Sequence, residues 1–540
     1  MLTSTLPASA VVTSIAPYTG PWTRLQAGHL LRRATFAPLK AEIDQALSLG
    51  LDGAINKLFA NVALPDLPVY YDYEDNPDAG IGNTWVDLPV SETNSNDDAS
   101  ARRRSLDGWW MASLATDQLT IREKMCFFWH NHFGIDGPGD ARAIYQFITK
   151  YRAFATGDFR EFVKQMAVNP SMLVFLNGNS NTRVNPNENF AREILELFTI
   201  GKGQQIGDGD YTNYTEQDVT ELARAFTGWR VRGLNTQVAG LGPESYYTTN
   251  RHDTTEKQLS HRFNNAIIEN NGENEYQDVV DLIFQQDEVS RFICRKLYRY
   301  FVYYKINDAV ESDIIEPMAQ ALRGADYVIA PALKLLLRSE HFYEASVIGD
   351  IIKSPIDVAH SIYRPTDYLN QGSVRDDYQA ARRAYLAARD MGLELRRPPS
   401  VSGWSAYYQG PGFHRLWLNT ATLQTRTDVQ NRALSRNGWY WDGARHPFDW
   451  LTTISRYDNP GDPNDLIAEM ADEFVPQALK PTQLSALKEL LLPGLQDFVW
   501  TSEYADLGAN PNDEALRVSV EVRLKHMVEG MLQLAEFHVH

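Results

Sequence analysis

The feature that most constrains the fold of this chain is a series of helix-period segments that end at Gly, Pro or Asn. In these segments apolar residues recur at spacings of three and four, as over residues 39–59, 143–168, 278–304 and 524–537. That spacing is typical of amphipathic α-helices. A short hairpin is expected only around residues 243–252. The sequence therefore predicts a mainly α fold, a large interlocked helical domain with long loops and little or no sheet.

We expect one domain with an arm and an insertion. Residues 1–20 form an N-terminal arm, and residues 21–540 form a single helical domain. The segment at about 65–100 is rich in Pro, Gly, Asn and Asp and has no sustained period, which predicts a loop-like insertion. We expect this insertion to be exposed and to be cut first by a protease. The spacing Thr215-x-x-Asp218 predicts a capping box at the start of a helix.

Composition excludes several classes of protein. Hydrophobic residues make up 43% of the chain, which is enough for a sizeable core. A formal net charge of −18 argues against general binding to nucleic acids or anionic membranes.

No apolar run approaches the roughly 18–20 residues of a membrane-spanning helix. The N-terminal residues carry no Lys or Arg before Arg24, so we expect no secretory signal peptide. Cys126 and Cys294 lie in apolar helical segments and are expected to be buried free thiols.

The stretch WHNHFG, residues 129–134, sets two histidines one residue apart between aromatic residues. If a helix continues through them, His130 and His132 point about 200° apart and share no face. If the chain leaves the helix at Asn131, the two rings can converge as an H-x-H metal pair. The alternative is a structural cluster in which each imidazole has its own hydrogen-bond partner.

Further polar groups for such a site come from two other segments. A helix over residues 188–200 places Arg192, Glu193 and Glu196 on one arc, and the stretch RHDTTEK contributes His252 and Asp253. A divalent metal ion is the cofactor that these groups would hold. The candidate catalytic residues are His130, His132, Arg192, Glu193 and His252, and the candidate metal ligands are His130, His132, Glu193, Glu196, His252 and Asp253. The structural alternative uses Glu188–Arg192 and Arg192–Glu196 as ion pairs along the helix.

Nine segments occur in the order seen in a known family. They are HLLRRATFAP, FFWHNHFG, NENFAREILELFTIG, YTEQDVTELARAFTGW, RHDTTEK, FICRKLYRYFV, LLLRSEHFY, KSPID and RPPSVSGW. From about His29 onward the chain resembles the large bacterial domain-of-unknown-function family numbered eighteen hundred. The resemblance implies a mainly helical fold and implies no particular activity.

Two functional hypotheses follow. The first is a metal-assisted hydrolase or oxidoreductase with a His/Glu centre. The second is a non-catalytic scaffold or binding protein for a polysaccharide or a sulfatase-like partner, because members of this family are often encoded beside the family numbered fifteen hundred and one, which resembles sulfatases. Some members of that neighbouring family resemble twin-arginine substrates. The resemblance thus implies a cytoplasmic protein or one exported folded with a signal-bearing partner.

Overall fold

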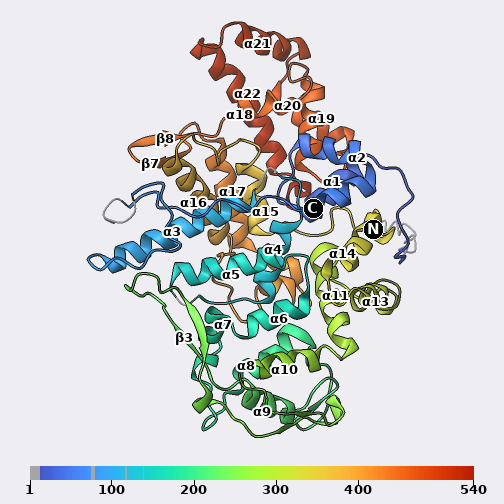
Figure 1. The fold of residues 1–540 in the computed structure, drawn as a ribbon. Helices are drawn as coiled ribbons and strands as arrows, with labels where there is room; N and C mark the ends of the chain where they lie inside the picture. Colours follow the sequence, from blue (N-terminus) through green and yellow to red (C-terminus); the bar gives the residue numbers. More distant parts are fainter. Residues whose placement is uncertain (1–12, 74–79, 116–117, 138) are drawn as a thin grey trace.

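The structure is a computed structural model that describes residues 13–540 apart from 74–79, 116–117 and 138. Helices dominate it, and the strands form only small two-stranded sheets (Figure 1). The predicted mainly α fold is confirmed.

The helices of the first half are α1 (Arg24–Ala34), α2 (Lys40–Leu58), α3 (Ser95–Leu114), α4 (Arg122–His132), α5 (Ala141–Ala153), α6 (Phe159–Ala167), α7 (Pro170–Phe175), α8 (Glu188–Glu193), α9 (Glu216–Ala225) and α10 (Glu275–Ile283). Those of the second half are α11 (Asp287–Phe301), α12 (Asp308–Val310), α13 (Glu316–Gly324), α14 (Ile329–Arg338), α15 (Pro355–Tyr363), α16 (Val374–Asp390), α17 (Thr420–Leu434), α18 (Trp450–Ile454), α19 (Pro463–Phe474), α20 (Pro481–Leu491), α21 (Asp497–Ala509) and α22 (Glu514–Leu532). Two π-helical segments, η2 (Ile194–Thr199) and η6 (Glu311–Ile315), continue α8 and α12.

The strands pair as four antiparallel hairpins. They are β1 (Gln205–Gly207) with β2 (Asp210–Tyr211), β3 (Trp229–Arg232) with β4 (Glu244–Tyr247), β5 (Lys257–Gln258) with β6 (Ile267–Ile268), and β7 (Trp439–Trp441) with β8 (Ala444–His446). The β3–β4 pair places Trp229 opposite Tyr247 and confirms the hairpin expected around residues 243–252.

Local sequence signals explain where several helices begin. Thr215 accepts a hydrogen bond from the backbone N–H of Asp218, and the Asp218 carboxylate accepts one from the N–H of Thr215 at 2.7 Å, which confirms the predicted capping box. Ser354 and Asp357 form the same box at the start of α15, where Pro355 occupies the first helical position. Each box satisfies backbone donors that the first turn of a helix leaves unpaired.

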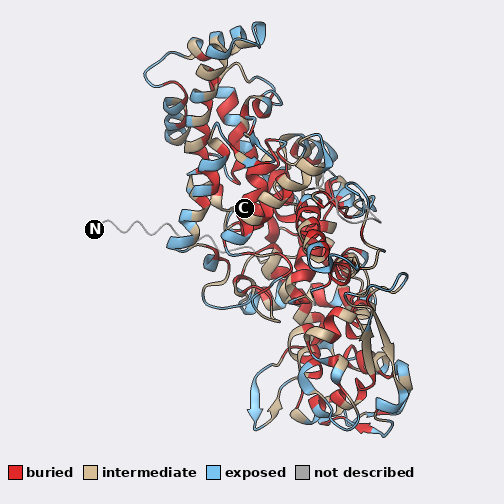
Figure 2. Ribbon diagram, turned by 90° about the vertical axis from the view of Figure 1, so that its left-hand side faces the viewer, coloured by how far each residue is buried: buried red, intermediate tan, exposed pale blue. Residues whose placement is uncertain are grey.

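Helix α4 lies near the centre of the molecule (Figure 1), and its residues from Glu123 to His132 are all buried except Asn131. Figure 2 shows the buried ribbon running through the middle of the molecule. Helix α4 packs against α3 and α5. Around it lies one continuous hydrophobic cluster, whose members range from Ala27 to Phe537 along the chain. The helices α19–α22 project at one end of the molecule, and α8–α10 with the hairpins β1–β6 occupy the other (Figure 1). Cys126 and Cys294 are free thiols in this core, as expected.

The expected arm and insertion are both packed against the body. Of the arm, residues 1–12 lie outside the described part, while Ala16 and Tyr18 form backbone hydrogen bonds with Glu340 and Arg338. Over its described residues, 65–73 and 80–94, the insertion has no helix before α3 begins at Ser95, as its composition predicts. The predicted exposure holds for part of it: residues 80–83 and 92–97 are exposed, whereas Tyr70, Tyr71 and Trp85 are fully buried, and residues 74–79 lie outside the described part. The division into domains stays a prediction.

A polar network holds the insertion in place. The Tyr70 hydroxyl donates to Asp98 and accepts from Arg102 Nε at 2.8 Å, and Arg102 also pairs with Asp98 at 2.9 Å. The Arg102 guanidinium donates further to the carbonyls of Leu88 and Pro89. The aromatic residues thus supply core contacts that the absence of a helical period in this segment does not reveal.

Among the helices that the structure describes, none has the length and apolar character needed to cross a membrane.

The buried ion pair between Glu123 of α4 and Arg152 of α5 provides a test of this architecture. Their side chains are each 2% exposed, and the ionic groups lie 3.0 Å apart. Replacing Glu123 by Ala should lower the free energy of unfolding by about 3–5 kcal/mol, because an unpaired guanidinium remains buried. The double variant Glu123→Leu, Arg152→Met should lose less. Urea unfolding followed by tryptophan fluorescence measures both.

A surface pair serves as the control for that experiment. Arg232 and Glu244 are 57% and 45% exposed, so Glu244→Ala should change the stability by less than about 1 kcal/mol. Equal losses for Glu123→Ala and Glu244→Ala would contradict the central role of α4.

Candidate functional site

His130 and His132 lie on the helical turn that ends α4 and face different neighbours. Because α4 continues to His132, the two rings diverge as an i, i+2 pair must. The His130 ring lies between Trp110 and Trp404, with ring centroids 4.7 and 5.2 Å away. The convergent H-x-H arrangement, which required the chain to leave the helix at Asn131, is therefore wrong.

The hydrogen bonds of His130 identify its tautomer. Its Nε2 accepts from the backbone N–H of Arg396 at 3.2 Å, so the ring proton is on Nδ1. Nδ1 faces the Tyr151 hydroxyl at 3.5 Å, and that hydroxyl donates to the carbonyl of Phe133 at 3.0 Å. Burial and the nearby Arg396 lower the pKa of His130 from its ordinary value of 6.5 to about 3. His130 is a neutral core histidine with both nitrogens in use.

His132 has the opposite tautomer and a more unusual partner. Its Nε2 donates to the carbonyl of Phe198 at 3.1 Å, so Nδ1 is left as an acceptor. Lys296 Nζ, from α11, donates to that Nδ1 at 3.0 Å and to the carbonyl of Leu197 at 2.9 Å. Burial and the positive charge of Lys296 lower the pKa of His132 well below its ordinary value.

The end of the helix formed by α8 and η2 explains these contacts. The last carbonyls of a helix have no partner within it. The carbonyls of Leu197 and Phe198 belong to the π-helical turn η2, and they accept from Lys296 and His132. A cation at a helix C-terminus is also favoured by the helix dipole. The pair Lys296–His132 therefore caps this helix.

Lys296 and His132 line a cavity of about 210 Å³ between α4, α11 and the segment around η8 (Ser405–Tyr407). Its aromatic wall comes mainly from Phe128, Phe292 and three tyrosines. Its polar groups include Glu196, Arg295 and Arg299. The tyrosines of the wall are Tyr300, Tyr407 and Tyr408.

Two cationic groups of this cavity, Lys296 and Arg299, are largely shielded from water. Burial and the positive charge of Arg299 lower the pKa of Lys296 from 10.5 to about 7. Burial and Arg295 lower the pKa of Arg299 as well, and its buried Nε has no hydrogen-bond partner within the described residues. Arg295 differs, because it pairs with Glu288 at 2.5 Å and with Glu311 at 2.6 Å. The lowered pKa brings loss of the Lys296 proton within reach near neutral pH.

The residues predicted on the arc of helix 188–200 separate in the structure. Arg192 pairs with Glu216 at 2.7 Å and with Glu188 at 3.3 Å. Glu196 lines the Lys296 cavity and accepts from the Tyr214 hydroxyl at 2.9 Å. Burial and the charge of Glu196 raise the pKa of Glu193. Of this set, only Glu196 shares a cavity with His132.

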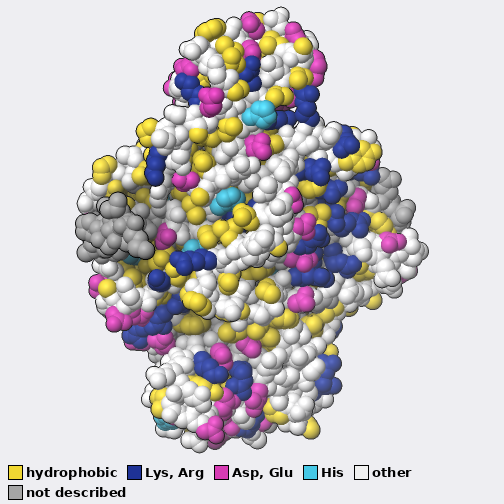
Figure 3. Space-filling view, turned by 180° about the vertical axis from the view of Figure 1, so that it is seen from behind, with side chains coloured by type: hydrophobic (Ala, Val, Ile, Leu, Met, Phe, Trp, Pro, Cys, Tyr) yellow, Lys and Arg dark blue, Asp and Glu magenta, His cyan; other side chains and the backbone are white. Residues whose placement is uncertain are grey.

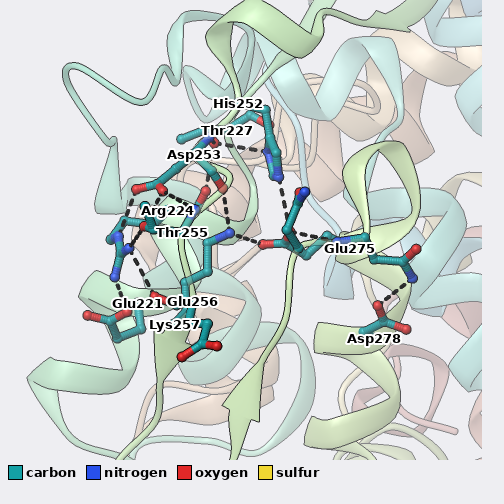
Figure 4. Close-up of polar contacts among 12 residues, drawn as sticks. Glu221, Arg224, Thr227, His252, Asp253, Thr255, Glu256, Lys257, Glu275 and Asp278 are labelled. Carbon is teal, nitrogen blue, oxygen red and sulfur yellow. Dashed lines mark hydrogen bonds and ion pairs between the residues drawn. The ribbon is translucent and has the colours of Figure 1, made fainter.

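His252 and Asp253 belong to a second cluster, which Figure 4 shows in close-up. His252 Nε2 lies 3.0 Å from Glu275 Oε2, and its Nδ1 lies 3.0 Å from the carbonyl of Thr227. Both ring nitrogens thus face acceptors. Lys257 pairs with the same Glu275 and donates to the carbonyl of Asp253 at 2.5 Å. These contacts join the β5 region to α9 and α10.

Asp253 is directed toward Arg224 in that cluster. The two side chains are 2.8 Å apart, and Thr255 also donates to Asp253. Although burial opposes it, hydrogen bonds from Arg224 and Thr255 lower the pKa of Asp253. None of the contacts of His252 or Asp253 is made with His130 or His132.

The candidate metal ligands are thus distributed over separate environments. Among the residues that the structure describes, no three His, Cys, Asp or Glu side chains form a group that could hold a metal ion. His130 and His132 already use both ring nitrogens, so either would have to lose a partner before binding an ion. The predicted divalent metal site stays a prediction.

A comparison with protein families matches residues 29–530 to the family described as "Protein of unknown function (DUF1800)". The chain belongs to the DUF1800 family. The resemblance carried by the nine sequence segments is thereby confirmed. No curated protein and no solved structure matches the chain.

The Lys296 cavity draws on four of the segments by which the chain resembles the DUF1800 family. These are FFWHNHFG, NENFAREILELFTIG, FICRKLYRYFV and RPPSVSGW. Sequence reasoning missed Lys296 and Arg299, because a basic residue in an amphipathic helix is usually solvated. The available signal was their position three residues apart on α11, between Phe292 and Tyr300.

The neutral state of His130 predicts a dependence of stability on pH. In the unfolded chain its imidazole takes up a proton below pH 6.5, whereas the folded chain resists protonation until about pH 3. Its contribution to stability is therefore complete above the unfolded pKa. Below that pKa it falls by up to about 1.4 kcal/mol per pH unit. The variant His130→Gln should show a shallower loss of stability between about pH 7 and 5.

Denaturant unfolding at several pH values measures this slope. His526→Gln is the control, because His526 is exposed and its substitution should leave the slope unchanged. Identical pH slopes in wild type and His130→Gln would show that His130 is not buried in its neutral form.

Proposed function

We propose that this protein is an enzyme that acts on a small organic carbonyl compound in the Lys296 cavity, with the Lys296 amine as the reacting group. The observation that carries the proposal is the contact of 3.0 Å between Lys296 Nζ and His132 Nδ1 at the wall of an aromatic cavity. A lysine in such surroundings differs from a solvated lysine, because an amine is nucleophilic only when it is unprotonated.

The hydrogen bonds of Lys296 support a free lone pair. A neutral amine has two N–H groups, and the two acceptors that face Nζ, His132 Nδ1 and the Leu197 carbonyl, use both. The remaining tetrahedral position on Nζ then holds the lone pair. In an amine-catalysed step, this lone pair attacks a carbonyl carbon, the C–N bond forms, and water leaves to give an imine. The same lone pair can instead remove a proton next to a carbonyl.

The walls of the cavity indicate the kind of molecule that would fit. Phe128, Phe292 and the tyrosines offer flat apolar surfaces for a hydrocarbon or ring. Arg299 adds a guanidinium without a hydrogen-bond partner on its Nε, which suits a carboxylate on the substrate. A volume of about 210 Å³ limits the ligand to a small molecule.

The two functions predicted from the sequence, a metal-assisted enzyme and a scaffold or binding protein, stay predictions. A metal-assisted hydrolase or oxidoreductase would require His132 and Glu196, the His/Glu pair in this cavity, to exchange present partners for an ion. A scaffold role beside a sulfatase-like partner makes no use of the cavity, and co-purification of the two proteins tests it. The burial of Lys296 beside His132 also has a structural explanation, because Lys296 caps the helix formed by α8 and η2. A test of the proposal therefore has to distinguish a capping lysine from a reactive one.

Reductive trapping tests the proposal directly. The protein is incubated at neutral pH with benzaldehyde or pyruvate and cyanoborohydride, and mass spectrometry locates the modified lysines. We expect Lys296 to be the most rapidly modified lysine, because most other lysines are protonated at this pH, and Lys353, whose pKa is also lowered to about 7, does not line the cavity. Lys296→Arg should lose this modification but keep its melting temperature, since arginine can still donate to the Leu197 carbonyl and to His132.

Lys202→Met is the matched control, because Lys202 is a more exposed lysine that contacts Glu196 at 3.6 Å. This variant should be trapped on Lys296 as the wild type is. If reagents modify only exposed lysines, Lys296 serves as a cap and the proposal fails.

A further inference from the structure

An arginine-rich surface covers the packed helices α3 and α16, and its members do not line the Lys296 cavity. Figure 3 shows Lys and Arg side chains gathered on the flank that carries these helices. The two helices make the most extensive helix contact of the fold, and a Cβ on Gly108 would meet the Tyr378 carbonyl at 2.9 Å. This close packing fixes the arginines of one helix beside those of the other.

The run Arg102, Arg103 and Arg104 divides between core and surface. Arg102 is buried and holds the insertion through Asp98 and Tyr70. Arg103 and Arg104 are partly exposed. Together with Arg382 of α16 and Arg397 of the following segment they form what we call the arginine surface. Its members are Arg103, Arg104, Arg382 and Arg397, and Arg396 is buried next to Arg103.

Carboxylates balance only part of this charge. Arg104 pairs with Asp72 at 2.8 Å, and Arg396 pairs with Asp107 at 2.6 Å. Arg397 is 63% exposed, and its nearest carboxylate, Glu394, is at 4.0 Å. With the buried Arg396 included, five arginines thus face three acids, an excess of two positive charges on a chain whose formal net charge is −18.

Arg103 and Arg382 have no ion-pair partner among the described residues. Arg103 donates only to the hydroxyl of Ser100 at 2.9 Å and to the carbonyl of Gly139 at 3.4 Å. Arg382 Nε is buried without a hydrogen-bond partner. Burial and the neighbouring Arg396, Arg397 and Arg104 lower the pKa of Arg103, with Asp107 opposing them, so these guanidinium groups repel one another.

Aromatic rings adjoin the arginine surface on the other side of α16. Arg383 follows Arg382 in the helix and lies 5.4 Å from the Trp439 ring centroid, with a hydrogen bond to the carbonyl of Tyr440. The Tyr440 side chain is 57% exposed, and Arg445 lies 5.4 Å from its centroid. Guanidinium groups and flat rings therefore occur together along α16 as well.

We infer that the arginine surface binds an acidic polysaccharide, whose sulfate or carboxylate groups contact Arg103, Arg382 and Arg397. Arginine offers paired N–H donors to such groups, and an exposed aromatic ring can pack on the apolar face of a sugar. The three arginines come from α3, α16 and the segment that follows α16. The acidic remainder of the chain disfavours a long nucleic acid.

Binding of fluorescent dextran sulfate to the full chain tests this inference. We expect binding that weakens as salt rises, because screening reduces interactions between exposed charges. The triple variant Arg103→Gln, Arg382→Gln, Arg397→Gln should bind at least about tenfold more weakly, since it removes three charge-assisted contacts at once. Neutral dextran should not bind.

The control variant removes the same number of charges elsewhere. It combines Arg232→Gln, Arg251→Gln and Arg517→Gln on other elements, and it should bind dextran sulfate as the wild type does. The single variant Arg397→Gln, at the most exposed position, is measured beside the triple variant in case the latter folds poorly, and it should also weaken binding.

Three results would overturn the inference. One is the absence of dextran sulfate binding by the wild type, and another is an equal loss in the two triple variants, which would reflect net charge alone. The third is tighter binding of a single-stranded oligonucleotide or of polyglutamate than of dextran sulfate. The first would exclude a polyanion, and the last would assign the surface to another class of polymer.

Discussion

The whole structure depends on the need to satisfy the polar groups of one buried helix. Helix α4 carries Glu123, Lys124, His130 and His132, and all four are buried. A buried charge or imidazole without a partner costs several kcal/mol, so each must find one in a distant part of the chain. The partners are Arg152, Asp357, the backbone of Arg396, and Lys296 with Phe198.

These five contacts connect α4 to five other segments of the chain. Lys124 and Asp357 lie 2.7 Å apart and join α4 to α15, whose capping box uses the same aspartate. Unlike hydrophobic contacts, such contacts are directional, so they fix the rotation of α4 about its axis. The same requirement brings Lys296 into a poorly solvated position beside His132. The proposed reactivity of Lys296 is thus a by-product of how the core is held together.

Sequence patterns predicted the local structure better than the site. Helix periods, the Thr215–Asp218 box and the hairpin near residue 243 depend on neighbours in sequence, and all three appear as expected. The fate of the histidines depends on Lys296, Tyr151 and Arg396, which lie between 21 and 266 residues away from them in the chain. The spacing of apolar residues along a helix does not reveal hydrogen bonds between residues this far apart in the chain.

Two segments show how tertiary contacts act beyond what local sequence predicts. The insertion at 65–100 has no helical period, yet Tyr70 is buried there because Asp98 and Arg102 satisfy its hydroxyl. His252 has the residue type of a ligand, but Glu275 and Thr227 occupy both of its nitrogens. In both cases tertiary hydrogen bonds decided the outcome, and sequence does not show them.

The π-helical turn η2 makes this region sensitive to chain length. An α-helix advances about 100° per residue, so the wider turn over Ile194–Thr199 sets the direction in which the Leu197 and Phe198 carbonyls point. Deleting one residue here could restore an ordinary α-helical turn and still leave a well-formed, amphipathic helix. The carbonyls would then rotate away from Lys296 and His132. Insertions and deletions in this turn are therefore more damaging to the cavity than most substitutions on its surface.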